Sequence, residues 1–147
     1  MFHCLFWSFR SCINGFQYYK PIVQVDGTWL YGTYSGTLLV AVAQDGNNKI
    51  LLIVFVVVES ESTGAWLLFL QNLKRHVTPQ HGLCLILDRH ESIKSTYSRC
   101  DIGWTTQNFV HAFCIRHVAH NYMRYKNNPI KTLIINMHEY QTSFSLY

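Results

Sequence analysis

The fold is decided by Pro21-Ile22-Val23-Gln24-Val25-Asp26-Gly27-Thr28-Trp29-Leu30. The apolar alternation after the proline predicts a β-strand over residues 21–29 that ends in the polar Asp-Gly-Thr turn. A second apolar run, residues 83–87, leads without a break into Asp88 and predicts a parallel strand that is covered on both faces. Because ligands in such sheets gather at the carboxyl ends of strands, Asp26 and Asp88 are candidates for one shared site.

The segment between these two strands predicts a hairpin and a helix. Residues 36–43 and 49–58 are β-prone and are separated by a turn-rich Gln-Asp-Gly-Asn-Asn, so we expect them to pair as the antiparallel edge beside the first strand. Residues 63–75 place apolar side chains three and four positions apart, which predicts an amphipathic helix. A short helix is expected near Glu91 and a longer one over residues 109–125. The order of these elements indicates an α/β fold.

Composition narrows the class of protein. The chain has 147 residues, of which 49% are hydrophobic and 14% are charged, so we expect one folded domain. Five cysteines form an odd set without regular spacing, which does not indicate a disulfide framework. The apolar run at residues 50–58 is too short to cross a membrane, and residues 1–9 lack the basic start of a secretory signal. The net charge of +4 permits nucleic-acid contact without requiring it.

Two carboxylates that converge on one place have a specific chemical use. Oxygen ligands hold Mg²⁺, and the bound ion activates water and stabilises a leaving oxygen. The alternative is that Asp26 belongs to a turn and Asp88 caps the following helix, which are common uses of aspartate. The spacing of the residues by itself leaves both interpretations open.

A longer series of residues resembles one family of proteins. It starts with residues 21–30 and continues through Gly32, Tyr34, Gly36, Leu38-Leu39, Asp45, Asn47, Asn48, Val58-Glu59, Glu61, Trp66, Asp88-Arg89-His90 and Phe113-Cys114-Ile115-Arg116-His117. In this order the series resembles the catalytic domain of Mutator-like (MULE) transposases. The similarity covers about residues 6–136, which is nearly the whole chain.

The resemblance implies a ribonuclease-H-like fold of the DDE superfamily. Such a fold has a mixed sheet, in which three antiparallel strands are followed by a parallel strand, flanked by helices. The resemblance also implies an acidic triad with Asp26 and Asp88 as its first two members, with Mg²⁺ or Mn²⁺ as cofactor and transposon ends and target DNA as partners. It further implies a nuclear location. We expect no membrane association, and an oligomer is compatible with the sequence.

The candidate for the third carboxylate is Glu139, the sole acidic residue after Asp101. Its neighbours do not resemble the catalytic helix of the family. We therefore expect a single partial domain over residues 1–147, with a core at about 20–125 and a degenerate or truncated tail at 126–147. Such a fragment is expected to be inactive alone.

Cysteine and histidine recur every third residue near the end of the similarity. If residues 109–125 form a helix, Cys114 and His117 share one face, whereas His111 and His120 lie on opposite sides, so zinc is not expected to bind this segment alone. The resemblance identifies Cys114 and His117 as the family's Cys-x-x-His motif. Its role as packing, as a substrate contact or as half of a metal site stays open, as does plain burial.

Other charged residues flank the predicted strands. Arg89 and His90 follow the second aspartate directly, where a basic pair is placed to contact a phosphate, and the alternative is a solvated pair in a loop. Glu59 and Glu61 are expected to begin the helix over residues 63–75 and to favour its N-terminal dipole.

Three functions fit these patterns. The leading one is a fragment of a transposase catalytic domain whose family chemistry is metal-dependent DNA strand cleavage and transfer. The alternatives are a domesticated, transposase-derived nuclear transcription regulator of the far-red-response type and a nonfunctional pseudogene product.

Overall fold

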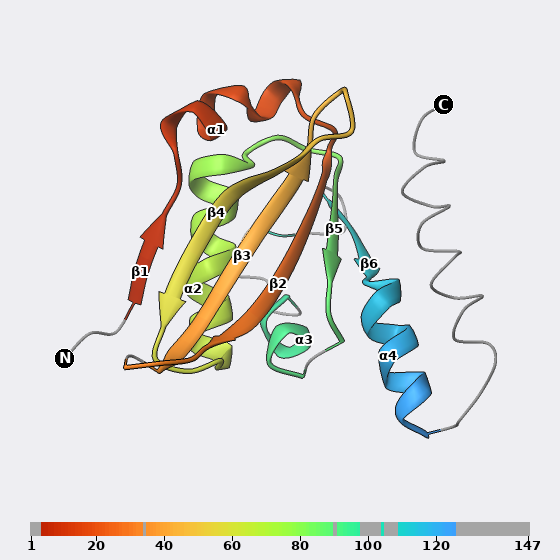
Figure 1. Ribbon diagram of the computed structural model, residues 1–147. Helices are drawn as coiled ribbons and strands as arrows, with labels where there is room; N and C mark the ends of the chain where they lie inside the picture. Colours follow the sequence, from red (N-terminus) through yellow and green to blue (C-terminus); the bar gives the residue numbers. More distant parts are fainter. Residues whose placement is uncertain (1–3, 34, 90, 98–103, 105–108, 126–147) are drawn as a thin grey trace.

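The computed structural model describes residues 4–33, 35–89, 91–97, 104 and 109–125 (Figure 1). Its elements are, in chain order, β1 (Cys4–Trp7), α1 (Arg10–Gly15), η1 (Phe16–Tyr18), β2 (Ile22–Leu30), β3 (Gly36–Gln44), β4 (Ile50–Val58), α2 (Thr63–Asn72), η2 (Leu73–Val77), β5 (Leu83–Leu87), α3 (Glu91–Tyr97), β6 (Phe109–Phe113) and α4 (Ile115–Tyr125). No helix in these ranges is long and apolar enough to cross a membrane.

One six-stranded sheet in the order β1-β4-β3-β2-β5-β6 organises the molecule. The pairs β1·β4, β4·β3 and β3·β2 are antiparallel, whereas β2·β5 and β5·β6 are parallel. This mixed sheet flanked by helices confirms the predicted α/β class and is consistent with a ribonuclease-H-like fold. The expected edge was wrong, because β1 adds a further antiparallel strand outside β4 and so takes the edge position.

Strand β2 runs straight through the sequence that predicted a turn. Residues from Val23 to Leu30 pair continuously with β3, so Asp26 lies inside the strand and not at its end. Against β5, however, the pairing covers only residues 22–24. The two strands therefore part just before Asp26, and Figure 1 shows them diverging toward the lower end of the sheet.

Helix α2 covers one face of the sheet, which Figure 1 shows from the opposite side. Ser62 caps the helix by accepting a hydrogen bond from the Ala65 amide at 3.2 Å, which satisfies one of the free amides of the first turn. The predicted stripe is confirmed, because Trp66, Phe69 and Leu70 are fully buried. A π-helical turn, η2, ends the predicted 63–75 segment.

Gly36 begins β3 where the backbone of the neighbouring strand comes close. A Cβ atom at this position would lie 2.8 Å from the carbonyl oxygen of Val58, which belongs to rigid backbone. We expect Gly36→Ala to lower the free energy of unfolding by about 1–3 kcal/mol, as for other overpacked sites. Urea denaturation measures the change, and Gly46→Ala is the control because no heavy atom lies within 4 Å of its Cβ position. Equal midpoints for the two variants would contradict this close approach.

The predicted helix over residues 109–125 was wrong in its first third. Residues Phe109–Phe113 form β6, which pairs along its whole length with β5, and only Ile115–Tyr125 form α4. Aromatic and β-branched residues such as Phe109, Val110 and Phe113 favour a strand, and the free edge of β5 supplies the hydrogen-bonding partner. The helix-face argument for the Cys and His residues therefore does not hold for His111.

Candidate functional site

Asp26 lies on β2, and Asp88 directly follows the neighbouring strand β5, at the same level and on the same face of the sheet. The parallel pairing matches Gln24 with Ile86, and the same register continued by two residues sets Asp26 level with Asp88. Side chains alternate along a strand. The Cβ position of Gly27 points at Trp66 of α2, so the Asp26 side chain projects from the opposite face. The two aspartate side chains are 35% and 30% exposed, so solvent reaches both.

Each aspartate is held by the backbone of the residue that follows it. The Gly27 amide donates to Asp26 Oδ1 at 2.9 Å, and the Arg89 amide donates to Asp88 Oδ1 at 2.6 Å. Among the residues that the structure describes, Oδ2 of either aspartate has no hydrogen bond or ion pair. The two carboxylates thus share one local geometry, in which the amide of the following residue holds Oδ1.

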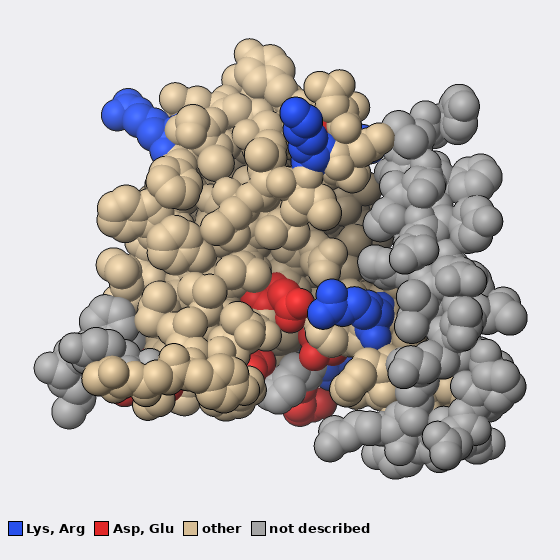
Figure 2. All heavy atoms as spheres, viewed as in Figure 1, with Lys and Arg blue, Asp and Glu red and all other residues tan. Residues whose placement is uncertain are grey.

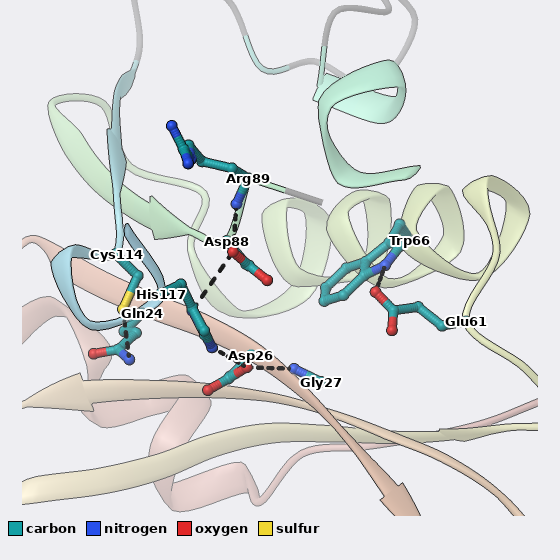
Figure 3. Close-up of polar contacts among 9 residues, drawn as sticks. All are labelled: Gln24, Asp26, Gly27, Glu61, Trp66, Asp88, Arg89, Cys114 and His117. Carbon is teal, nitrogen blue, oxygen red and sulfur yellow. Dashed lines mark hydrogen bonds and ion pairs between the residues drawn. The ribbon is translucent and has the colours of Figure 1, made fainter. Parts of the chain in front are cut away.

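His117 lies between the two carboxylates (Figure 3). Its Nε2 is 3.7 Å from Asp26 Oδ1, and its Nδ1 is 3.7 Å from Asp88 Oδ1. Both distances exceed the 2.7–3.2 Å that is typical of an N–H···O hydrogen bond. The Nδ1 atom is buried and has no hydrogen-bond partner in the described part of the chain. The ring therefore lies close to both carboxylates without a hydrogen bond of normal length to either.

Cys114 fixes the helix that carries this histidine. Its amide donates to the Leu87 carbonyl at 2.8 Å, its carbonyl accepts from the Val118 amide, and the Gln24 side chain donates to its sulfur at 3.9 Å. The side chain is 4% exposed. Cys114 thus joins the start of α4 to β5 and β2, and His117, about one turn later, faces the carboxylates. In this Cys-x-x-His motif the cysteine packs and the histidine reaches the site.

The remaining Cys and His candidates lie apart from this arrangement. His111 is on β6, where its ring packs edge to face on the Phe113 ring with the two ring centroids 4.6 Å apart. Burial lowers the pKa of the His111 imidazole. His120 is exposed on α4. Within the described ranges, no group of three or more His, Cys, Asp or Glu side chains converges so as to hold a metal ion.

The flanking charged residues have different surroundings. Arg89 is exposed next to Asp88, and Figure 2 shows basic side chains directly beside the acidic side chains on this face. His90 and Glu139 lie outside the described residues. Glu59 and Glu61 precede α2 and do not begin it, because Ser62 is the cap. Glu61 accepts a hydrogen bond from the Trp66 indole at 3.0 Å, which is a structural use.

The sequence did not single out His117 as the side chain between the two aspartates. The Cys-x-x-His spacing was the available signal. The predicted helix over residues 109–125 hid its meaning, because the motif lies at the junction of β6 and α4. The strand β6 carries the motif past Leu87 to the same end of the sheet as Asp88, which brings the histidine to the carboxylates.

Comparison with known protein families identifies the family of this chain. Residues 22–121 match the family model described as the MULE transposase domain. The matched segment contains Asp26, Asp88, Cys114 and His117. No curated protein matches the chain.

Proposed function

Because this chain belongs to the family of MULE transposase domains, we propose that Asp26 and Asp88 are the first two ligands of a divalent metal used in DNA strand cleavage and transfer. The observation that carries the proposal is the common setting of the two aspartates. They lie on one face where β2 and β5 part, and both contact the single ring of His117. The nuclear location expected for such chemistry is part of the same proposal.

The donor atoms suit Mg²⁺ or Mn²⁺. Hard cations of this kind prefer oxygen, retain several waters and are commonly held by one or two carboxylates together with substrate phosphates. Each aspartate has Oδ1 held by a backbone amide and Oδ2 without a partner among the described residues. A bound cation would supply Lewis-acid stabilisation of the phosphodiester oxygens and an activated nucleophile.

This chain's own residues have separable parts in that chemistry. The amides of Gly27 and Arg89 orient the carboxylates, and Cys114 fixes the position of α4 beside them. The exposed Arg89 guanidinium is placed to contact a phosphate of the DNA backbone, where arginine commonly binds. Trp66 and Leu39 close the opposite face of β2 at Gly27, so DNA would approach from the face that carries the aspartates.

We further propose that the chain by itself does not cleave or join DNA. Two-metal hydrolysis needs ions fixed on both the attacking and the leaving oxygens, and only two carboxylates meet at this site within the described residues. A misplacement of about 1 Å can reduce a rate by about a hundredfold. The third carboxylate would come from outside the described residues, and Glu139 is the candidate for it.

A nuclease assay tests this proposal. The wild-type chain, Asp26→Asn and Glu139→Gln are incubated with Mn²⁺ and a DNA duplex that carries terminal inverted repeats, and nicked and joined products are separated on a denaturing gel. We expect no cleavage above background from any of the three. Metal-dependent cleavage that is lost in both variants would overturn the inactivity of the chain and identify Glu139 as the third ligand. Cleavage that persists in Asp26→Asn would contradict the assigned site.

A further inference from the structure

The place between the two carboxylates is taken by a side chain. His117 faces Asp26 with one ring nitrogen and Asp88 with the other, each at 3.7 Å. A divalent ion bound by both carboxylates must approach an oxygen of each to about 2.0–2.6 Å. Figure 3 shows that the ring contacts one oxygen of each carboxylate, so it lies directly beside both groups that the ion would join.

We infer that the imidazole of His117 occupies the cation's place between Asp26 and Asp88, so that a divalent ion binds only when the ring leaves. This inference rests on the proposed metal site. The ring lies 3.7 Å from an oxygen of each carboxylate, so it fills space that a shared ion would need. Without the ring, two carboxylates of like charge would face one another across a gap, which is unfavourable.

The surroundings favour a ring that leaves by side-chain rotation. The Cys114 amide bonds to the Leu87 carbonyl and the Gln24 side chain contacts the Cys114 sulfur, so the start of α4 is fixed to the sheet. The ring itself is 24% exposed and makes no hydrogen bond of normal length to either aspartate. A loosely held ring on a fixed helix can turn toward solvent while the helix stays in place.

The inference predicts that removal of the ring strengthens metal binding. We expect His117→Ala and His117→Asn to bind Mg²⁺ and Mn²⁺ about tenfold more tightly than the wild-type chain, which corresponds to about 1.4 kcal/mol. A histidine that served as a metal ligand would have the opposite effect, because its loss would weaken binding. The direction of the change therefore separates the two roles.

Calorimetric titration of the full chain with MgCl₂ and with MnCl₂ decides the matter. The variants are wild type, His117→Ala, His117→Asn and the control His120→Ala, which removes an exposed histidine three residues along the same helix. Tighter binding in both His117 variants with an unchanged control supports the inference. Equal or weaker binding in the His117 variants overturns it and leaves the metal site in place. Absence of binding in every chain would overturn the proposed function and this inference with it.

Thermal unfolding gives a second measurement that does not depend on heats of binding. In metal-free buffer the His117→Ala chain should melt below wild type, since its carboxylates lose the intervening ring. Added Mg²⁺ should raise the melting temperature of His117→Ala more than that of wild type, because at a given concentration a ligand that binds the folded state more tightly stabilises it more. Equal increments would contradict the inference even where the variant is less stable.

Discussion

Replacement of both Asp26 and Asp88 by asparagine is expected to abolish the binding of Mg²⁺ and Mn²⁺. Asparagine keeps the size and one oxygen of each side chain but removes the negative charge on which a hard cation depends. The wild-type chain should bind these ions only weakly, because two carboxylates supply few protein ligands and the ions keep several waters. The double variant should give no saturable heat in a calorimetric titration.

The control for this experiment is Glu59→Gln, which removes one exposed carboxylate outside the site. Its metal affinity should equal that of wild type. Unchanged affinity in the double variant would refute the assignment of the two aspartates. The structure also limits the change in stability without metal. Because His117 already lies between the carboxylates, their removal relieves little repulsion, and we expect the free energy of unfolding to change by no more than about 0.5 kcal/mol.

Trp66→Ala is expected to lower the free energy of unfolding by about 3–5 kcal/mol, the usual range for a large aromatic side chain removed from a core. The Trp66 side chain is fully buried under β2 and packs edge to face on Phe69 at 5.7 Å. Its indole also donates to Glu61, so the variant would leave that carboxylate without this partner. Such a loss is a large part of the stability of a typical small domain.

Urea denaturation followed by circular dichroism measures this loss. The matched control is Trp29→Ala, since Trp29 lies on β2 with 59% of its surface exposed, and its replacement should cost no more than about 0.5 kcal/mol. Trp66→Phe should fall between the two, because it keeps most of the packing and loses the hydrogen bond to Glu61. Similar losses for Trp66→Ala and Trp29→Ala would show that α2 does not close the core as described.

The sequence predicted the central strands and the first helix because their periodicity is strong and local. The apolar runs at β2, β4 and β5 and the stripe of α2 differ little from their predicted bounds. Asp26-Gly27-Thr28 was misread for a reason that is not local. A polar triplet looks like a turn, yet eight consecutive pairs with β3 keep it extended. Hydrogen bonding to β3, and not the local sequence, therefore decides the conformation of this triplet.

The two aspartates of the site could be predicted from local sequence patterns, whereas the position of His117 could not. Each aspartate follows a strongly apolar run, so their candidacy could be read from the sequence. The position of His117 depends on β6, whose five residues suit a strand or a helix until the open edge of β5 is considered. The His117 ring contacts Asp26 and Asp88, which lie 91 and 29 residues earlier in the chain. Contacts over such separations depend on the tertiary structure and could not be read from the local sequence.

The short pairing of β2 with β5 leaves the two aspartates with different backbone partners. The strands are bonded at residues 22–24, and Asp26 and Asp88 lie beyond that bonded length on arms that diverge. Each arm keeps a different partner, because β2 stays paired with β3 as far as Leu30 and the Cys114 amide bonds to Leu87 directly before Asp88. The backbone at each aspartate is therefore held by a separate neighbour, so a change at one carboxylate does not have to pass through the β2·β5 ladder to reach the other.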